Sequence, residues 1–426
     1  MRFEDLVQRF PELPRLALLK TDVLRSGVRL EAPIGSRYFH HHDEAGQKAV
    51  PDARTHMQGS IELPGGVHVF VRHHAKSPYA LVTDPETGKM WLADGADQSH
   101  ITEVTPGPRL QWPGQRTSRG TPNGSLFSPS LGGACGPVAI FLLRYCEFVT
   151  DEQECKFCSW VRMGKSHEVR PNVDDMREAI RAVWQEQGSV GYLALSGGSL
   201  FNRTKEADAF LLYMNAMRET GERVPPTVAA IQAMDRADSA RLKEAGFDYV
   251  CYSMEVWKDT LWPEIMPGKA KSVGRERWMD CLKEAVDVFG PGRVMCNFVA
   301  GVETAVPGAF ATPEAAAEST LEGMVWCYEN GIYPKYSTWI VPGAARYSDR
   351  PAAPLEYYAK FLPGRQQLFA QYDMPVPATD CPRCLTESLE SDLARLDPAR
   401  FALGPAAEFL TRRDHGPARS ATPPAV

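Results

Sequence analysis

From residue 137 onward, strand-like runs alternate with amphipathic helical segments, and this alternation limits the possible folds more than any other feature of the chain. Strands are predicted at 138–145, 190–196, 226–232, 248–255, 293–301 and 335–341. Helices are predicted between them, at 174–187, 205–219, 235–245, 275–289 and 313–330. Repeated strand–helix units give parallel strands with right-handed crossovers, so we expect an α/β fold, either an open doubly wound sheet or a partial TIM-type barrel. The prediction carried forward is a partial (βα)6 barrel, with the chemistry at the carboxyl ends of its strands.

The rest of the chain reads as additions to this barrel. Residues 1–33 have helical spacing, and residues 57–115 alternate like short strands joined by Pro/Gly hairpin signals, which predicts an N-terminal antiparallel β module. The stretch 105–134 is rich in Gly, Pro and Ser and reads as a long connection. We therefore predict an N-terminal module and linker at 1–134, a core barrel at 135–345 and a C-terminal extension at 346–426 with a disordered tail.

Composition excludes several partner classes. Hydrophobic residues make up 43% of the 426 residues and charged residues 23%, which is typical of a chain with a sizeable folded core. The net charge of −6 gives no general attraction to nucleic acid or anionic membranes, and neither is an expected partner. No run approaches the roughly 18 apolar residues of a membrane helix, and the first residues lack the pattern of a signal peptide. We expect a cytoplasmic protein, whose ten cysteines are buried thiols or metal ligands rather than disulfides.

Three of these cysteines stand together directly after the first predicted barrel strand. Cys146, Cys155 and Cys158 follow that strand with the spacing C-x8-C-x2-C. A multi-iron site needs several thiolates on one loop, and three protein ligands would leave one iron open for catalysis. A zinc site, or a chance C-x-x-C beside an unrelated cysteine, would also fit the cysteines alone.

The strand, the three-cysteine loop with Phe157 before its last cysteine, and the βα units that follow resemble the radical S-adenosylmethionine (radical SAM) superfamily over roughly 135–345. Eight residues separate the first two cysteines, where the commonest pattern of the family has three. The resemblance implies a [4Fe–4S] cluster held by Cys146, Cys155 and Cys158, with S-adenosylmethionine on the fourth iron and Phe157 near its adenine. It also implies reductive cleavage of that cofactor to a 5′-deoxyadenosyl radical, which abstracts hydrogen from a small-molecule substrate. The electron would come from a one-electron reductant such as flavodoxin or ferredoxin.

Further candidate cofactor contacts lie at the ends of later strands. Adjacent glycines let backbone approach a ligand and leave N–H and C=O groups free to bind it. Ser253 and Glu255 alternate onto one face, and a cation in the following loop can pair with a carboxylate. By the resemblance, a Gly-Gly-Ser segment stands in place of the family's Gly-Gly-Glu motif, a carboxylate and a cation meet the cofactor's polar groups, and two later segments lie beside adenine. The candidates are Gly197, Gly198, Ser199, Ser253, Glu255, Lys269, Asn297, Gly301 and Pro342.

A second C-x-x-C, at Cys381 and Cys384, lies beyond the predicted barrel. It fits half of a structural zinc site, a redox pair or part of an auxiliary iron–sulfur cluster. A structural or substrate-proximal role is favoured, because no further C-x-x-C completes a set of four thiolates. The alternative function for the whole chain is a zinc or iron–sulfur binding protein without radical chemistry.

Overall fold

The structure is a computed structural model of the full chain. It describes residues 2–30, 60–72, 74–106, 111–129, 138–149, 152–158, 170–187, 191–221, 223–341, 345–378, 388–389 and 391–406. Pro342, Cys381 and Cys384, together with residues 407–426 of the predicted tail, lie outside these ranges.

A seven-stranded sheet forms the centre of the molecule, in the order β13-β12-β11-β10-β9-β8-β7. Strands β8 to β13 are parallel and adjacent in chain order, and only β7 is antiparallel. A doubly wound sheet reverses its strand order at a switch point, whereas a barrel does not. The sheet is therefore a partial barrel, as predicted. Its strands are β7 (Phe127–Pro129), β8 (Val138–Leu143), β9 (Leu193–Gly197), β10 (Thr227–Ala230), β11 (Tyr249–Cys251), β12 (Val294–Ala300) and β13 (Tyr333–Thr338).

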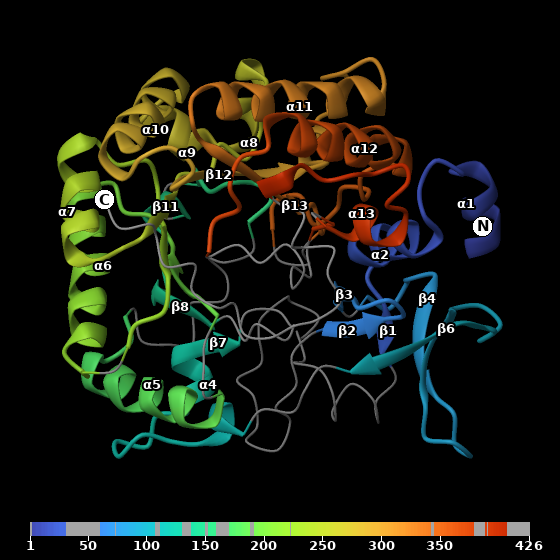
Figure 1. Ribbon diagram of the computed structural model, residues 1–426, viewed down its shortest axis with the longest axis horizontal. Coiled ribbons are helices and arrows are strands. Elements are labelled where there is room, and N and C mark those ends of the chain that lie inside the picture. The colour runs from blue at the N-terminus through green and yellow to red at the C-terminus, as the bar shows by residue number, and fades with distance from the viewer. Residues whose placement is uncertain are drawn as a thin grey trace.

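Helices follow the strands and form an arc around the sheet (Figure 1). They place the sheet's buried side chains against apolar helix faces, in one core cluster that includes Leu195, Val250 and Phe298. The side chain of Thr312 caps the helix after β12 by accepting a hydrogen bond from the backbone N–H of Ala315 (3.2 Å). The helices are α5 (Val173–Gln187), α6 (Arg203–Arg218), α7 (Arg236–Ala245), α8 (Trp262–Ile265), α9 (Pro267–Ser272), α10 (Arg275–Phe289), α11 (Pro313–Glu329) and α12 (Leu355–Tyr372).

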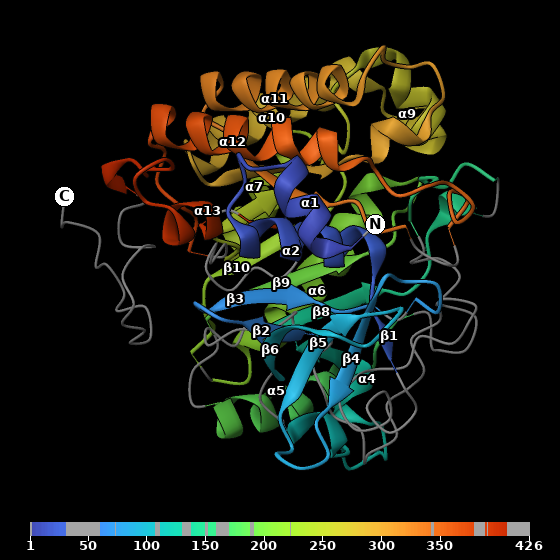
Figure 2. The same cartoon turned by 90° about the vertical axis from the view of Figure 1, so that its right-hand side faces the viewer.

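A second sheet of six strands lies beside the barrel, with two N-terminal helices next to it (Figure 2). The predicted antiparallel pairing of short strands is present: β2 pairs with β3 and β4 pairs with β5, each antiparallel. The first strand, β1, instead pairs with β4 in parallel. The elements are α1 (Phe3–Arg9), α2 (Arg15–Ser26), β1 (Arg29–Leu30), β2 (Ser60–Leu63), β3 (Val67–Phe70), β4 (Tyr79–Thr83), β5 (Met90–Asp94) and β6 (His100–Pro106).

The described part of the stretch 105–134, which is predicted as a long connection, contains folded elements. This stretch contains a 3-10 turn, η1 (Trp112–Gly114), a short helix, α4 (Asn123–Leu126), and strand β7, which adds an antiparallel edge to the barrel sheet. The indole of Trp112 is fully buried. The Gly and Pro residues thus shape tight turns in a folded segment, where the composition alone suggests an open linker.

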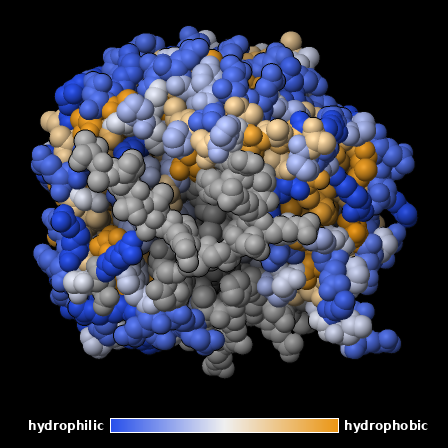
Figure 3. Space-filling model, viewed as in Figure 1, coloured by the Kyte–Doolittle hydropathy of each residue, from blue (hydrophilic) through white to orange (hydrophobic). Residues whose placement is uncertain are grey.

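The C-terminal segment packs back on the N-terminal helices. Lys20 of α2 and Asp392 of α13 (Asp392–Leu396) form an ion pair of 2.7 Å whose side chains are 0% and 1% exposed. Loss of either partner would leave a buried charge unpaired and lower the stability of the fold. The pair therefore links α2 to α13. In the described residues, no helix combines the length and the apolar character that a membrane crossing requires. The outer helices present mostly hydrophilic side chains (Figure 3). The division at 134 and 345 stays a prediction.

Candidate functional site

The loop with the three cysteines begins where β8 ends, at the carboxyl end of the first parallel strand. After Cys146 the chain makes a 3-10 turn, η2 (Glu147–Val149), which buries the ring of Phe148. It then turns back, with the Gln153 N–H donating to the Phe148 carbonyl (2.7 Å). A final tight turn carries the Cys158 N–H to the Cys155 carbonyl (2.9 Å). The three cysteines are half-buried.

Backbone hydrogen bonds from three other parts of the barrel hold this loop. One comes from the loop after β9, two from the α8–α9 segment and one from the chain after β13. The bonds are Glu147 N–H to Ser199 O (2.9 Å), Gly268 N–H to Gln153 O (2.9 Å), Lys156 N–H to Ile265 O (2.9 Å) and Tyr347 N–H to Lys156 O (2.9 Å). A loop fixed at four points presents its side chains in a defined arrangement, which a catalytic metal site requires.

The adjacent glycines stand at the end of β9, where Gly197 is the last residue of the strand and Gly198 follows it. The Gly198 N–H donates to the Leu143 carbonyl (2.8 Å), and the Ser199 carbonyl accepts from Glu147, so these groups are not free for a ligand. A Cβ atom on Gly198 would lie 1.9 Å from the Tyr145 carbonyl oxygen and 2.7 Å from the Cβ of Cys146. Glycine is needed here because the backbone touches the cysteine loop.

Replacing Gly198 with alanine is therefore expected to push the loop after β9 away from Cys146. A backbone atom cannot rotate away as a side chain can, so we expect a loss of stability at or above the roughly 1–3 kcal/mol typical of overpacking. Chemical denaturation of Gly198→Ala and wild type measures this loss. A Gly198→Ala protein as stable as wild type would contradict the tight contact.

A lysine, Lys269, and a glutamate, Glu255, lie close enough to the cysteine loop to shift the pKa of its thiols. Burial raises the pKa of the Cys155 thiol, the charge of Lys269 opposes this rise, and Cys158, Glu255 and Cys146 add to it. Burial also raises the pKa of Cys146, and the backbone amides of Ser199 and Phe148 act against it. The raised pKa values favour the protonated thiol form of Cys146 and Cys155 when no metal is bound. A bound metal, by contrast, favours the thiolate form.

The described residues contain no group of three His, Cys, Asp or Glu side chains placed to hold one metal ion. A single zinc ion requires its sulfur ligands about 2.3 Å away, and hence close to one another. A cluster of several irons, in contrast, takes each thiolate on a different iron. Soft thiolate donors on one anchored loop are the ligand type that iron–sulfur clusters take.

Lys269 and Glu255 form an ion pair beside the cysteine loop. The Lys269 ammonium lies 2.8 Å from Glu255 Oε1 and 4.9 Å from the centre of the Trp278 ring, with 11% and 12% of the two paired side chains exposed. Burial lowers the pKa of Lys269, but Glu255 and Cys155 outweigh it and raise the pKa, so the lysine is charged. The sequence predicted a cation for the cofactor; in the structure this cation already has a protein partner.

Glu255 is also one of four described non-glycine residues with positive φ, at +65°. Strand β11 ends at Cys251, so simple alternation does not set the direction of the Glu255 side chain. Its backbone is fixed instead by β12, because its N–H donates to Asn297 O (3.0 Å) and its carbonyl accepts from the Val299 N–H (2.8 Å). Left-handed backbone in a non-glycine residue costs on the order of 1–3 kcal/mol and is concentrated at functional sites.

The remaining predicted residues are spread over the barrel. Ser253 is half-buried near Cys251 (Oγ to Sγ 3.8 Å), and Asn297 Nδ2 donates to Ser337 Oγ (3.4 Å). Phe157 packs at the edge of the main core. Gly301 has a φ of +101°, and a Cβ there would lie 2.7 Å from Tyr358 Oη, so helix packing explains this glycine.

The turn after Gly301 contains a buried carboxylate, Glu303, which is 3% exposed. It accepts hydrogen bonds from the Gly301 N–H (3.1 Å), the Tyr357 hydroxyl (2.8 Å) and the Thr320 hydroxyl. Burial raises the pKa of Glu303 from 4.5 to about 7, against these hydrogen bonds.

This raised pKa predicts a pH effect on stability. Because the folded state binds the Glu303 proton more tightly, the stabilisation is complete below pH 4.5 and is lost as pH rises through about 7. We expect the unfolding free energy of wild type to fall between pH 5 and 8 by up to about 3 kcal/mol more than that of Glu303→Gln. Urea denaturation at both pH values measures the difference, and parallel pH profiles would contradict it.

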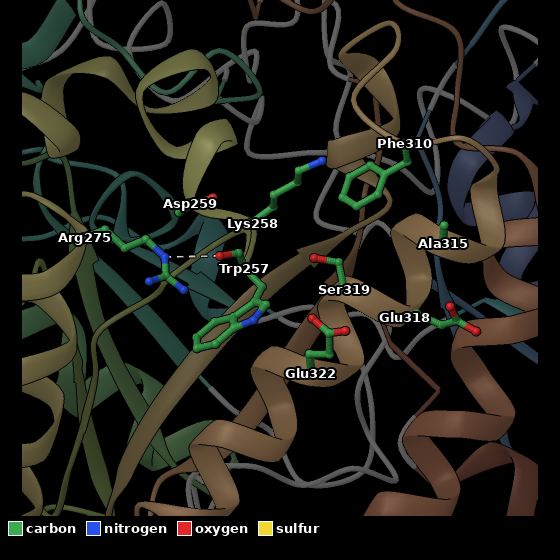
Figure 4. Close-up of a pocket in the computed structure, with 9 residues that line it drawn as sticks. All are labelled: Trp257, Lys258, Asp259, Arg275, Phe310, Ala315, Glu318, Ser319 and Glu322. Carbon is green, nitrogen blue, oxygen red and sulfur yellow. Dashed lines mark hydrogen bonds between the residues drawn. The ribbon is translucent and has the colours of Figure 1, made fainter.

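A separate pocket of about 460 Å³ lies between Arg275, at the start of α10, and the residues of α11 that line it (Figure 4). Two cations there lie over aromatic rings: Lys258 is 4.4 Å from the Phe310 ring centre and Arg275 is 4.5 Å from that of Trp257. The lining residues are Trp257, Lys258, Asp259, Arg275, Phe310, Ala315, Glu318, Ser319 and Glu322. None of them belongs to the cysteine loop.

Comparisons with known proteins were made for the whole chain. No protein-family model matches it. The bacteriochlorophyllide c C-7(1)-hydroxylase of Chlorobaculum limnaeum is 24% identical over 226 residues, which is 47% of this chain and 51% of the hydroxylase. The chain thus spans about half the length of this curated relative.

The search of solved structures found, among others, three that match part of the chain at low sequence identity. A radical SAM methyltransferase from Sphaerobacter thermophilus has a TM-score of 0.37 at 14% identity, over 64% of this chain and 81% of its own. Methylornithine synthase (PylB) has a TM-score of 0.40 at 14% identity, over 53% and 62%. The FeFe-hydrogenase maturase HydG from Carboxydothermus hydrogenoformans has 0.36 at 13%, over 48% and 45%.

Proposed function

We propose that this chain is a radical SAM enzyme. Cys146, Cys155 and Cys158 hold a [4Fe–4S] cluster, and S-adenosylmethionine binds beside it in the barrel. The observation that carries the proposal is the position of the three thiols: they share one anchored loop at the carboxyl end of the first barrel strand, within the field of the Lys269–Glu255 pair. When bound, these two groups supply one-electron cleavage of the sulfonium and a radical that removes hydrogen from the substrate.

The chain's own residues provide the binding and the closed environment. Glu255 and Lys269 would supply opposite charges to the cofactor, and Ser253, just after β11, and Asn297 of β12 would supply polar groups. The other proposed contacts are Phe157, Gly197, Gly198, Ser199, Gly301 and Pro342. In this role the Gly-Gly-Ser segment and Gly301 act by close packing of backbone.

The substrate is a small molecule that the barrel encloses, and a flavodoxin or ferredoxin supplies the electron. One relative is named a hydroxylase and one solved neighbour a methyltransferase, and neither reaction is assigned to this chain. For Cys381 and Cys384, a structural zinc or a second cluster stays a prediction.

Metal analysis after anaerobic reconstitution tests the proposal. The protein is incubated with iron and sulfide, freed of excess reagent, and analysed for iron, sulfide and zinc. We expect about four irons and four sulfides per chain, as a [4Fe–4S] cluster requires. One zinc per chain, with no retained iron, would instead indicate a structural metal-binding protein and would refute the proposal.

A further inference from the structure

A buried carboxylate on α6 joins two loops beside the cysteine loop. Glu206 lies in the first turn of α6 and is 1% exposed. Its Oε2 accepts from the Leu200 N–H (2.6 Å) and from Gln232 Nε2 (2.5 Å), and its Oε1 accepts from the Gln232 N–H (3.3 Å). Gln232 Nε2 also donates to the Leu200 carbonyl (2.7 Å). Glu206 and Gln232 therefore fix the chain after β9 to the chain after β10.

The loop held by Glu206 is the one that touches Cys146. Leu200 follows Ser199, whose carbonyl accepts the Glu147 N–H (2.9 Å), and Gly198 packs on the backbone of Tyr145. The Ser199 amide acts on the Cys146 thiol, where it lowers the pKa against burial. A short chain of contacts thus leads from Glu206 through Leu200 and Ser199 to the first cysteine.

We propose that Glu206 is a positioning residue for Cys146: through its hydrogen bonds with Leu200 and Gln232 it holds the Ser199 backbone against the cysteine loop. The inference rests on the proposed function insofar as Cys146 is a cluster ligand. Glu206 acts through Ser199. A carboxylate suits the position because all three groups that face it are donors, whereas a glutamine would turn one N–H2 group toward another donor.

The chain offers a matched control in Glu303. It is 3% exposed, accepts three hydrogen bonds, and has a pKa raised by burial to about 7, as Glu206 has. It lies after β12 and bonds to Gly301, with no hydrogen bond to the cysteine loop. Loss of either carboxylate should lower the stability of the protein by a similar amount. A different effect of the two variants on the cysteine loop would then report the positioning role of Glu206.

Hydrogen exchange on the full-length protein, prepared without metal, provides the test. In Glu206→Ala, we expect amide exchange in peptides covering 144–149 to rise about tenfold, because the Glu147 N–H loses its fixed acceptor. Glu303→Ala should leave these peptides at the wild-type rate. After reconstitution, Glu206→Ala should retain less iron than Glu303→Ala when both are compared well below their unfolding temperatures.

Two further variants keep the test decisive. If Glu206→Ala does not fold, Glu206→Gln and Gln232→Leu replace it, and both should accelerate exchange in 144–149 relative to Glu303→Ala. Equal exchange and equal iron retention in the Glu206 and Glu303 variants would overturn the proposal. If wild type retains no iron, the proposed function fails and the ligand role with it, while the exchange data alone still decide whether Glu206 holds the loop.

Discussion

Alanine in place of Cys146, Cys155 or Cys158 is expected to abolish formation of 5′-deoxyadenosine from S-adenosylmethionine. Each cysteine would ligate a different iron, so the two that are left cannot hold the cluster in place. Loss of a residue that only supports a ligand typically costs 10- to 100-fold in metal affinity or activity, so loss of a ligand itself should exceed about 100-fold. Nucleoside release per chain and retained iron, measured on the same reconstituted samples, give the two readouts.

Cys281→Ala is the matched control for these variants. Cys281 is fully buried on α10, near α7 and away from the cysteine loop, so its loss removes one thiol without touching the proposed ligands. We expect this variant to keep its iron and its nucleoside product. Should the Cys146, Cys155 and Cys158 variants retain as much iron as Cys281→Ala, the three cysteines would not be the ligands.

Lys269→Met is expected to destabilise the protein by about 3 kcal/mol, because it leaves the Glu255 carboxylate charged and mostly buried without its partner. Methionine keeps the length of the side chain and its contact with the Trp278 ring, so the loss reports mainly on the charge. Urea denaturation of the metal-free protein at neutral pH measures the change.

The double variant Lys269→Met with Glu255→Gln separates charge from packing. Removing both charges of a buried pair usually costs less than removing one, so the double variant should recover part of the lost stability. A Lys269→Met protein within about 1 kcal/mol of wild type would contradict a buried ion pair between Lys269 and Glu255.

The strongly patterned elements of the fold could be predicted from the sequence. Helix α10 was predicted at 275–289 and is found there, and α11 ends one residue earlier than predicted. Strand β13 was predicted at 335–341 but spans Tyr333–Thr338. Its second residue, Pro334, argues against a strand, yet β13 is the edge of the sheet, where a missing N–H is tolerated. The short antiparallel β7 had no alternation long enough to be recognised.

The cysteines and several partners were visible in the sequence, but their contacts were not. Lys269 and Glu255 were predicted separately, and only the fold of α8 and α9 brings the ammonium to the carboxylate. Glu206 was missed because an acid in the first turn of a helix is ordinary dipole compensation, here after the Asn202 cap. Burial distinguishes Glu206 from an ordinary exposed acid in a first helical turn. This burial depends on the loops after β9 and β10, which the sequence pattern does not place.

Nucleoside release on reduction tests the proposed radical SAM activity most directly. The protein is reconstituted with iron and sulfide under anaerobic conditions, mixed with S-adenosylmethionine and reduced with dithionite. We expect 5′-deoxyadenosine from wild type and none from Cys146→Ala. A wild-type protein that holds its full iron and sulfide but releases no nucleoside on reduction would contradict the proposed activity.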